Sequence, residues 1–315
     1  MTPRPIALLG PTASGKTRLA LELAERLPVE IISLDSALVY RGMDIGTAKP
    51  SPAERAVAPH HLIDIILPPE AYSAAQFVAD CTRLCQQILA RGRWPLIVGG
   101  TMMYYHALTH GLNQLPEADP AIRAALQAEK EAQGLAALYA KLQQYDPATA
   151  ERLKPGDSQR IERALEVYLL TGKPLSAHFA EQQAPASALP NLTTIALIPE
   201  DRSLLHRHIA QRFETMLQQG FLDEVDRLAA DYPELTPDYP SIRCVGYRQA
   251  WEYRAGLYSY AEFVEKGIAA TRQLAKRQLT WQRNFRDNWA DLVEVDSLAP
   301  DAEGQVRALV EAGLG

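Results

Sequence analysis

The chain has 315 residues, of which 47% are hydrophobic and 22% charged, as in a soluble globular protein with one large domain or two ordinary ones. Its formal net charge of −6 argues against indiscriminate nucleic-acid binding but is compatible with a local basic groove. No apolar run approaches the ~20 residues that span a bilayer, and the first apolar stretch is too short for a signal peptide. We therefore expect a cytoplasmic protein with no membrane partner.

Strand and helix signals alternate over the first hundred residues. Short apolar runs predict strands over residues 5–10, 29–36 and 94–101, and helices are predicted over 16–27 and 73–93, the second with Ser73 as its N-cap. Such alternation is typical of a parallel sheet with helices on both faces, in which ligands bind beyond the carboxyl ends of the strands.

The pattern changes near residue 112. Residues 121–153 and 157–176 read as consecutive helices without a strand, and a Pro/Ala-rich linker over 181–191 leads to a buried strand at 192–199. Long helices follow over 201–220 and 261–285. This order predicts an α/β core of residues 1–111 and 191–315, its second part carrying the C-terminal helices, interrupted by a helical insertion of residues 112–190.

The stretch "GPTASGKT" follows the first predicted strand and opens the first predicted helix. It matches the phosphate-loop pattern G-x-x-x-x-G-K-[ST], in which backbone amides and the positive end of the helix dipole bind an anion. Lys16 adds a full charge, and the Thr17 hydroxyl is a candidate ligand for Mg²⁺. The fold class is therefore predicted to be P-loop NTPase-like. The candidate phosphate-binding residues of this loop are Gly10, Thr12, Ala13, Ser14, Gly15, Lys16 and Thr17.

The surroundings of this loop differ from those of an ordinary nucleotide hydrolase. The strand at 94–101 ends in Gly99, Gly100 and Thr101 rather than in the Asp that usually holds Mg²⁺. No N-K-x-D segment for reading guanine occurs. The acid at a strand end is instead Asp35, which lies near the phosphates if its strand neighbours the first one. A carboxylate there either binds a metal or accepts a proton from an incoming nucleophile.

Several further residues carry weaker signals. His60 and His61 are adjacent and lack metal-ligand spacing, which favours a turn or strand-edge role. The three cysteines are expected to be small buried apolar residues without a disulfide: Cys81, Cys85 and Cys244. Three aromatic residues are candidates for the pocket, although each is more commonly found in a core: Tyr104, Tyr105 and Trp281.

Seven segments together resemble the bacterial tRNA dimethylallyltransferase family, also called tRNA isopentenyltransferases. They run in order across nearly the whole chain: "GPTASGKT", "SLDSALVYRGMDIGTAKPS", "HHLIDI", "VGGTMMYYHALTHGL", "DSQRIERALEVYLLTGKP", "SIRCVGYRQ" and "TRQLAKRQLTW". The resemblance implies transfer of a dimethylallyl group from dimethylallyl diphosphate to N6 of adenosine 37 in tRNA. The phosphate loop then holds the leaving diphosphate with Mg²⁺, and Asp35 acts on the adenine amine.

The resemblance also implies roles for residues outside the loop. Thr101 is expected near the reacting groups, and Arg212 is expected to bind the diphosphate. The helical insertion corresponds to the part of the family that contacts the anticodon stem. The residues implied in tRNA binding are Asp35, Ser36, Ala37, Leu38, Arg123, Gln159, Arg160, Ile161, Glu162, Arg163, Arg243, Cys244, Val245, Gly246, Tyr247, Arg248, Arg272 and Lys276.

Two other functions are compatible with the loop alone. A small-molecule or nucleotide kinase would use Asp35 as base for a phosphate acceptor, but it gives no reason for the helical insertion or for the acid-free basic run at residues 272–286. A non-catalytic nucleotide switch or RNA-binding module lacks its guanine-reading segment. We favour the prenyltransferase, and without coiled-coil heptads we expect a monomer.

Overall fold

The computed structural model describes residues 4–112, 115–181, 187–189, 191–287 and 292–313. Contacts divide the chain into two compact units, residues 1–109 with 188–315, and residues 110–187. No described helix is long and apolar enough to cross a membrane.

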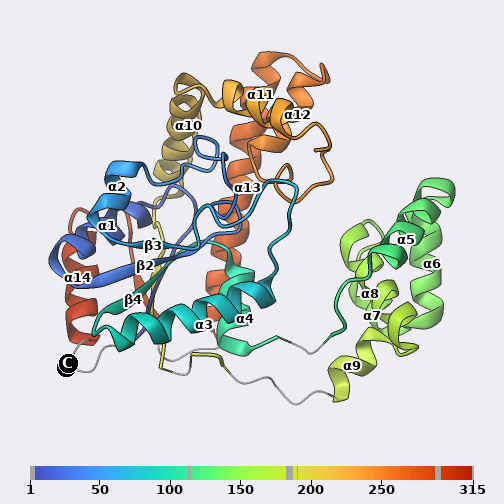
Figure 1. The fold of residues 1–315 in the computed structure, drawn as a ribbon, viewed down its shortest axis with the longest axis horizontal. Helices are drawn as coiled ribbons and strands as arrows, with labels where there is room; N and C mark the ends of the chain where they lie inside the picture. Colours follow the sequence, from blue (N-terminus) through green and yellow to red (C-terminus); the bar gives the residue numbers. More distant parts are fainter. Residues whose placement is uncertain (1–3, 113–114, 182–186, 190, 288–291, 314–315) are drawn as a thin grey trace. The chain divides into compact units, whose positions relative to one another are not determined.

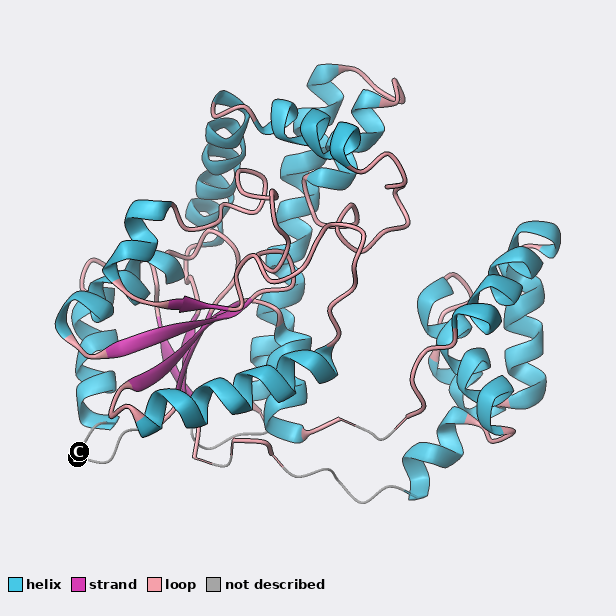
Figure 2. Cartoon of the chain, viewed as in Figure 1, coloured by secondary structure: helices cyan, strands magenta, loops and turns pink. Residues whose placement is uncertain are grey.

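The larger unit contains one six-stranded sheet in which every pairing is parallel. Its strands are β1 (Ile6–Leu9), β2 (Val29–Leu34), β3 (His60–His61), β4 (Trp94–Gly99), β5 (Thr193–Leu197) and β6 (Leu292–Val295), arranged in the order β3-β2-β4-β1-β5-β6. The predicted parallel sheet flanked by helices is confirmed (Figure 2). His60 and His61 form an edge strand, as expected.

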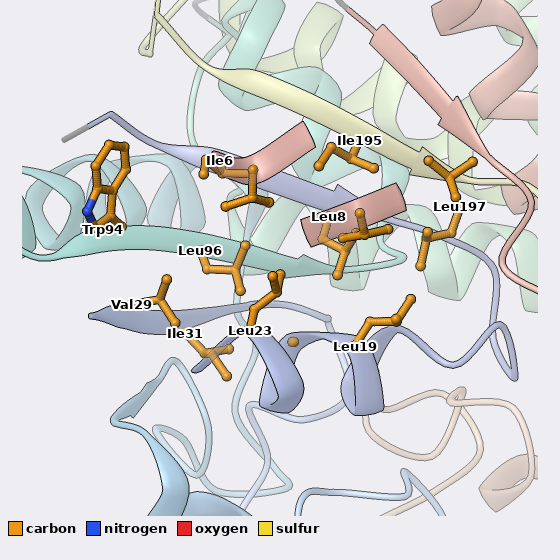
Figure 3. Packing of buried hydrophobic residues seen from close by; sticks show 14 of the residues in the cluster. Ile6, Leu8, Leu19, Leu23, Val29, Ile31, Trp94, Leu96, Ile195 and Leu197 are labelled. Atoms are coloured by element: carbon orange, nitrogen blue, oxygen red, sulfur yellow. The ribbon is translucent and has the colours of Figure 1, made fainter. Parts of the chain in front are cut away.

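Two helical layers cover the two faces of this sheet. Helices α1 (Lys16–Arg26) and α14 (Ala302–Gly313) pack on one face, where Leu19 and Leu23 are directed at the strands (Figure 3). Helices α3 (Ala74–Ala90) and α4 (Met102–His110) cover the other. Successive residues of a strand point to opposite faces, so Leu8 of β1 joins the first layer and Leu9 the second.

A third apolar cluster lies beyond the sheet, among α10 (Arg202–Gln218), α11 (Phe221–Asp231), α12 (Tyr247–Arg254) and α13 (Tyr260–Arg286) (Figure 1). Val39, Tyr40 and Met43, which follow β2, pack among these helices. The segment continues into α2 (Pro52–Val57), whose N-cap Ser51 forms a capping box with Glu54. A loop from the first half of the chain is thereby fixed by helices from the second half.

The smaller unit is entirely helical where it is described. It contains α5 (Pro120–Gln133), α6 (Leu135–Tyr145), α7 (Pro147–Arg152), α8 (Ser158–Thr171) and α9 (Leu175–Glu181) around a core of its own. The helix predicted over 121–153 is three helices, because Gly134 has φ 84° between the first two and Pro147 starts the third. Of the predicted linker at 181–191, residues 182–186 and 190 lie outside the described residues.

Candidate active site

A cavity of about 550 Å³ lies at the carboxyl ends of β1, β2 and β4. Its walls come from the turns after these strands, from residues 46–48 and 240–246, and from α10 and α13, all within the larger unit. This is the edge at which parallel sheets bind ligands. The location expected for the ligand therefore coincides with the large cavity.

The phosphate loop forms one wall of the cavity. Ala13 and Gly15 both have positive φ, 62° and 83°, which turns the chain sharply into α1. A Cβ on Gly10 would lie only 2.6 Å from the Ser14 hydroxyl oxygen, so a side chain there would collide with the loop. Ser14 is fully buried, and its hydroxyl has no hydrogen-bond partner among the described residues. A buried hydroxyl without such a partner, next to Gly10 in the loop, is free to donate a hydrogen bond to a bound anion.

Two cations approach the loop and repel one another. The Lys16 ammonium donates to the Pro11 carbonyl over 2.7 Å. Burial and the nearby Arg212 lower the pKa of Lys16 to about 8, and the Asp35 carboxylate partly opposes this. Arg212 lies on α10 and lines the same cavity, and its pKa is lowered by burial. An anion bound here would neutralise the repulsion between these two partly desolvated cations, so the pair favours anion binding.

Asp35 is held in place by its own turn. Its Oδ1 accepts hydrogen bonds from the amides of Ala37 and Leu38, at 2.8 and 3.4 Å. Its Oδ2 has no partner among the described residues, and the half-buried side chain lines the cavity. Thr101 accepts from the Ser36 amide at 3.0 Å. A carboxylate oxygen and a hydroxyl, fixed at two strand ends, therefore lie at the cavity wall.

The sequence placed Asp35 near the phosphates on the condition that its strand neighbours the first one. That condition is not met, because β4 lies between β2 and β1. Asp35 nevertheless interacts electrostatically with Lys16 and Arg212. The reason is that the turns after all three strands bend toward the same cavity, so adjacency of the strands is not required.

The cavity combines cationic and apolar surface. Among its lining residues Asp35 is the only acid, whereas four are cationic: Lys16, Arg212, Arg243 and Arg277. Apolar lining comes from the turn after β2, from β4, and from helices α4, α10, α11 and α13: Leu38, Val98, Met102, Met103, Ile209, Phe213, Met216, Phe221, Leu274 and Trp281. Trp281 is 37% exposed, whereas Tyr104 and Tyr105 are buried core residues. Of the three aromatic candidates, only Trp281 lines the cavity.

Gln278 is a residue that sequence reasoning missed. Its Oε1 accepts from the Thr12 amide and its Nε2 donates to the Gly100 carbonyl, each at 2.9 Å. It connects α13 to the turns after β1 and β4. The Thr12 amide is consequently already engaged, although the pattern assigned Thr12 to the anion. No spacing rule reveals a contact between residues 266 positions apart.

Residues 243–248 divide between the cavity and the core. Arg243, Val245 and Gly246 line the cavity. Cys244 also lines it and packs against the third apolar cluster while only half-buried, and burial together with Asp35 raises the pKa of its thiol to about 12. Tyr247 is fully buried, so its side chain faces the interior. Cys81 and Cys85 are buried and free, as expected.

The basic face of α13 is exposed. Arg272 and Lys276 are exposed and have no ion-pair partner among the described residues, whereas Arg248, on α12, pairs with Glu252 at 3.0 Å. Arg286, at the end of α13, pairs with Asp287 at 3.3 Å. Two cations, one helical turn apart, are thus available to an anionic partner.

In the smaller unit, the predicted RNA-contacting residues differ in exposure. Gln159 and Arg160 are exposed, but Ile161 is fully buried, so its side chain supports the helix rather than meeting a partner. Arg123 and Arg163 both bind the buried Glu166 carboxylate, at 2.9 and 2.7 Å. Glu162 pairs with Lys130 at 2.8 Å. Arg123 and Arg163 therefore stabilise the helical unit through Glu166, in addition to their expected role in tRNA binding.

The donors around the cavity suit a divalent cation that also binds phosphate. No cluster of three or more His, Cys, Asp or Glu that could hold a metal occurs among the residues that the structure describes. Mg²⁺ is commonly bound by one carboxylate or hydroxyl together with substrate phosphates and waters. Thr17 and Asp35 both line the cavity, and this donor set fits such an ion.

Comparisons with known proteins agree with one another. A family model described as IPP transferase matches residues 38–285. A tRNA dimethylallyltransferase of Neisseria meningitidis serogroup A is 67% identical over 282 residues, 90% of each chain. The structure of a tRNA isopentenylpyrophosphate transferase from Bacillus halodurans is 36% identical with a TM-score of 0.69, covering 99% of this chain and 96% of that one. A eukaryotic dimethylallyltransferase acting on tRNA is 26% identical with a TM-score of 0.80, covering 98% of this chain and 78% of that one.

Proposed function

The chain belongs to the IPP transferase family, and from this premise we propose that it transfers a dimethylallyl group from dimethylallyl diphosphate to tRNA. The acceptor is N6 of adenosine 37, next to the anticodon, and diphosphate is released. The observation that carries this proposal is the cavity itself, in which a phosphate loop, four cationic side chains and an apolar wall meet one strand-end carboxylate.

The donor substrate matches the two kinds of surface in the cavity. The diphosphate binds the amides and hydroxyls of the phosphate loop, together with Lys16 and Arg212. Its negative charge offsets the repulsion that lowers the pKa of Lys16. The five-carbon chain lies against apolar residues such as Met103 and Leu274.

The reaction is a displacement at the allylic carbon. The N6 nitrogen forms a bond to C1 of the dimethylallyl group, the C1–O bond breaks, and its electron pair leaves with the diphosphate. Lys16 and Arg212 stabilise the charge that grows on the leaving oxygen. Asp35 accepts the proton from N6 through Oδ2, and Thr101 helps to orient the amine. Thr17 would hold Mg²⁺ beside the diphosphate, and the ion would supply further charge neutralisation.

The tRNA is bound by basic and polar groups both on the surface and in the cavity lining. Arg272 and Lys276 of α13 contact the phosphate backbone. Arg243, Val245 and Gly246 line the cavity that an adenosine must enter after leaving its stack. In the helical unit, Gln159 and Arg160 bind the tRNA. Arg123 and Arg163, which pair with Glu166, also contribute to tRNA binding. The acidic molecule therefore binds RNA through local basic surface.

Nucleoside analysis tests this function. The protein is incubated with unmodified tRNA, Mg²⁺ and dimethylallyl diphosphate, and the tRNA is digested and examined by mass spectrometry. We expect one adenosine to gain the mass of a five-carbon prenyl group. Phosphorylation of a small acceptor by ATP, with no prenylated nucleoside, would overturn the proposal in favour of a kinase.

A further inference from the structure

A buried carboxylate that the proposed reaction does not use lies behind the cavity wall. Glu224, in the first turn of α11, is 2% exposed. Its Oε2 accepts from the amides of Asp44 and Ile45 at 2.9 and 2.7 Å, and its Oε1 from the amide of Gly46 at 3.1 Å. Tyr247 donates its hydroxyl to the same Oε1. All four contacts are donors, which suits the acceptor-only carboxylate.

The backbone that Glu224 holds belongs to the cavity wall. Gly46, Thr47 and Ala48 line the cavity, and the Thr47 carbonyl accepts from an Arg212 Nη2 at 3.5 Å. Lys49, at the end of this loop, donates to the Tyr40 carbonyl at 2.6 Å and to the Asp44 carboxylate at 2.7 Å. Glu224 binds the backbone amides of residues 44–46, directly before Thr47, whose carbonyl contacts Arg212.

There is little room for the loop to shift. A Cβ on Gly46 would lie 2.2 Å from the Phe221 ring and 2.6 Å from the Tyr247 ring, so the backbone packs directly on both. Burial and Glu224 raise the pKa of Tyr247 well above its usual value, which keeps its hydroxyl a donor. Tyr247 directly follows Gly246, itself a cavity residue. One carboxylate therefore joins two separate walls of the site.

We propose that Glu224 is a positioning residue, which fixes the loop of residues 44–48 so that the Thr47 carbonyl orients the Arg212 guanidinium toward the diphosphate. This inference rests on the proposed function, because Arg212 needs an anionic ligand to orient toward. Glu224 itself does not contact the substrate. Loss of the Glu224 carboxylate is expected to weaken diphosphate binding through the Arg212 guanidinium.

The test is a double-mutant cycle on the intact protein. Glu224→Gln is close to isosteric, but its NH2 group cannot accept from a backbone amide. In one orientation it loses the bonds from Asp44 and Ile45, and in the other it loses the bond from Gly46, while the Tyr247 hydroxyl can turn to accept. The dissociation constant of dimethylallyl diphosphate is measured by calorimetry with Mg²⁺ for the wild type, Glu224→Gln, Arg212→Ala and the double variant. Asp231→Asn removes the same charge from an exposed position of α11 and serves as the matched control.

We expect Glu224→Gln to weaken binding about tenfold in the wild-type background and to have almost no effect in the Arg212→Ala background. Asp231→Asn should bind like the wild type. An unchanged dissociation constant for Glu224→Gln, or equal losses in both backgrounds, would overturn the inference. If Glu224→Gln does not fold, Tyr247→Phe, which removes one donor and leaves the three amides, replaces it in the cycle with an expected loss of a few-fold.

The same samples separate this inference from the proposed function. A wild type that neither binds dimethylallyl diphosphate nor prenylates tRNA contradicts the proposed function, and the inference with it. A wild type that does both, with additive effects of the two substitutions, contradicts the inference alone.

Discussion

At the scale of single residues, the site depends on how Asp35 and Lys16 are held. The Asx-type turn uses one carboxylate oxygen of Asp35 for the amides of Ala37 and Leu38 and leaves the other toward the cavity. The partly desolvated Lys16 beside Arg212 has a pKa of about 8. Orientation and charge are therefore set before any substrate binds.

The carboxylate of Asp35 is tested by Asp35→Asn, which keeps the oxygen that accepts from the turn and removes the base. We expect kcat for prenyl transfer to fall by about 10²-fold or more, a typical contribution of a general base. The affinity for tRNA, measured by filter binding, should stay nearly unchanged. Reduced tRNA affinity with normal turnover would assign Asp35 to binding instead.

The pH dependence of diphosphate binding follows from Lys16. Its pKa in the free protein is about 8, so raising the pH above that value removes the charge that attracts the ligand. Phosphate groups, with a second pKa of about 6, stay ionised there. We expect the affinity for dimethylallyl diphosphate, measured by calorimetry from pH 7 upward, to decline above pH 8 in the wild type. Lys16→Ala should bind weakly at every pH, and a parallel decline in that variant would rule out Lys16 as the titrating group.

At the scale of elements, α13 both presents a basic face and supports the phosphate loop. Arg272 and Lys276 are exposed, and Gln278, further along the helix, is buried between the Thr12 amide and the Gly100 carbonyl. The helix that is proposed to bind RNA is therefore physically joined to the loop that is proposed to bind diphosphate.

The RNA-binding face is tested by the salt dependence of tRNA affinity. Each phosphate contact contributes about 0.7 to 0.9 to the slope of log K against log salt. Lys276→Ala should weaken binding and make this slope shallower by about that amount. Lys266→Ala, on the same helix but over the Tyr258 ring, is the matched control and should keep the wild-type slope. Equal slopes for both variants would show that this face of α13 is an ordinary solvated surface that does not contact the tRNA phosphates.

The support given by Gln278 is tested by its removal. Gln278→Ala leaves the Thr12 amide and the Gly100 carbonyl without their partner, so the free energy of unfolding should fall by about 1–3 kcal/mol. The KM for dimethylallyl diphosphate should rise more than the KM for tRNA. Gln273→Ala, exposed on the same helix, should change neither quantity. An unaltered KM for the diphosphate would show that Gln278 does not shape the loop.

Local patterns predicted most elements, and long-range contacts account for what they missed. Ser73 was predicted as an N-cap and forms a capping box with Gln76, because that signal lies within four residues. The Gly134 break was missed because the apolar spacing continues on either side of it. The contact from Glu224 to Asp44 spans 180 residues and has no local signature. The phosphate loop and Asp35 were found because each follows an apolar strand, whereas Gln278 lies within an ordinary helical pattern.

At the scale of the whole molecule, an acidic chain concentrates positive charge in one cavity. Its net charge is −6, yet the cavity has four cationic side chains and one acid. Lys16 and Asp35 follow strands β1 and β2, and the three arginines, Arg212, Arg243 and Arg277, come from the second half of the chain. The fold thus gathers charge that the composition does not reveal, and it sets that charge beside an apolar wall suited to a prenyl group.

The central claim is that the phosphate loop holds a diphosphate that leaves as tRNA is prenylated. The most direct measurement compares the initial rates of diphosphate release and of tRNA prenylation in one sample that contains no nucleoside triphosphate. We predict one diphosphate released per prenyl group transferred, and loss of both in Lys16→Ala. Diphosphate release without tRNA, or prenylation that requires ATP, would contradict the account.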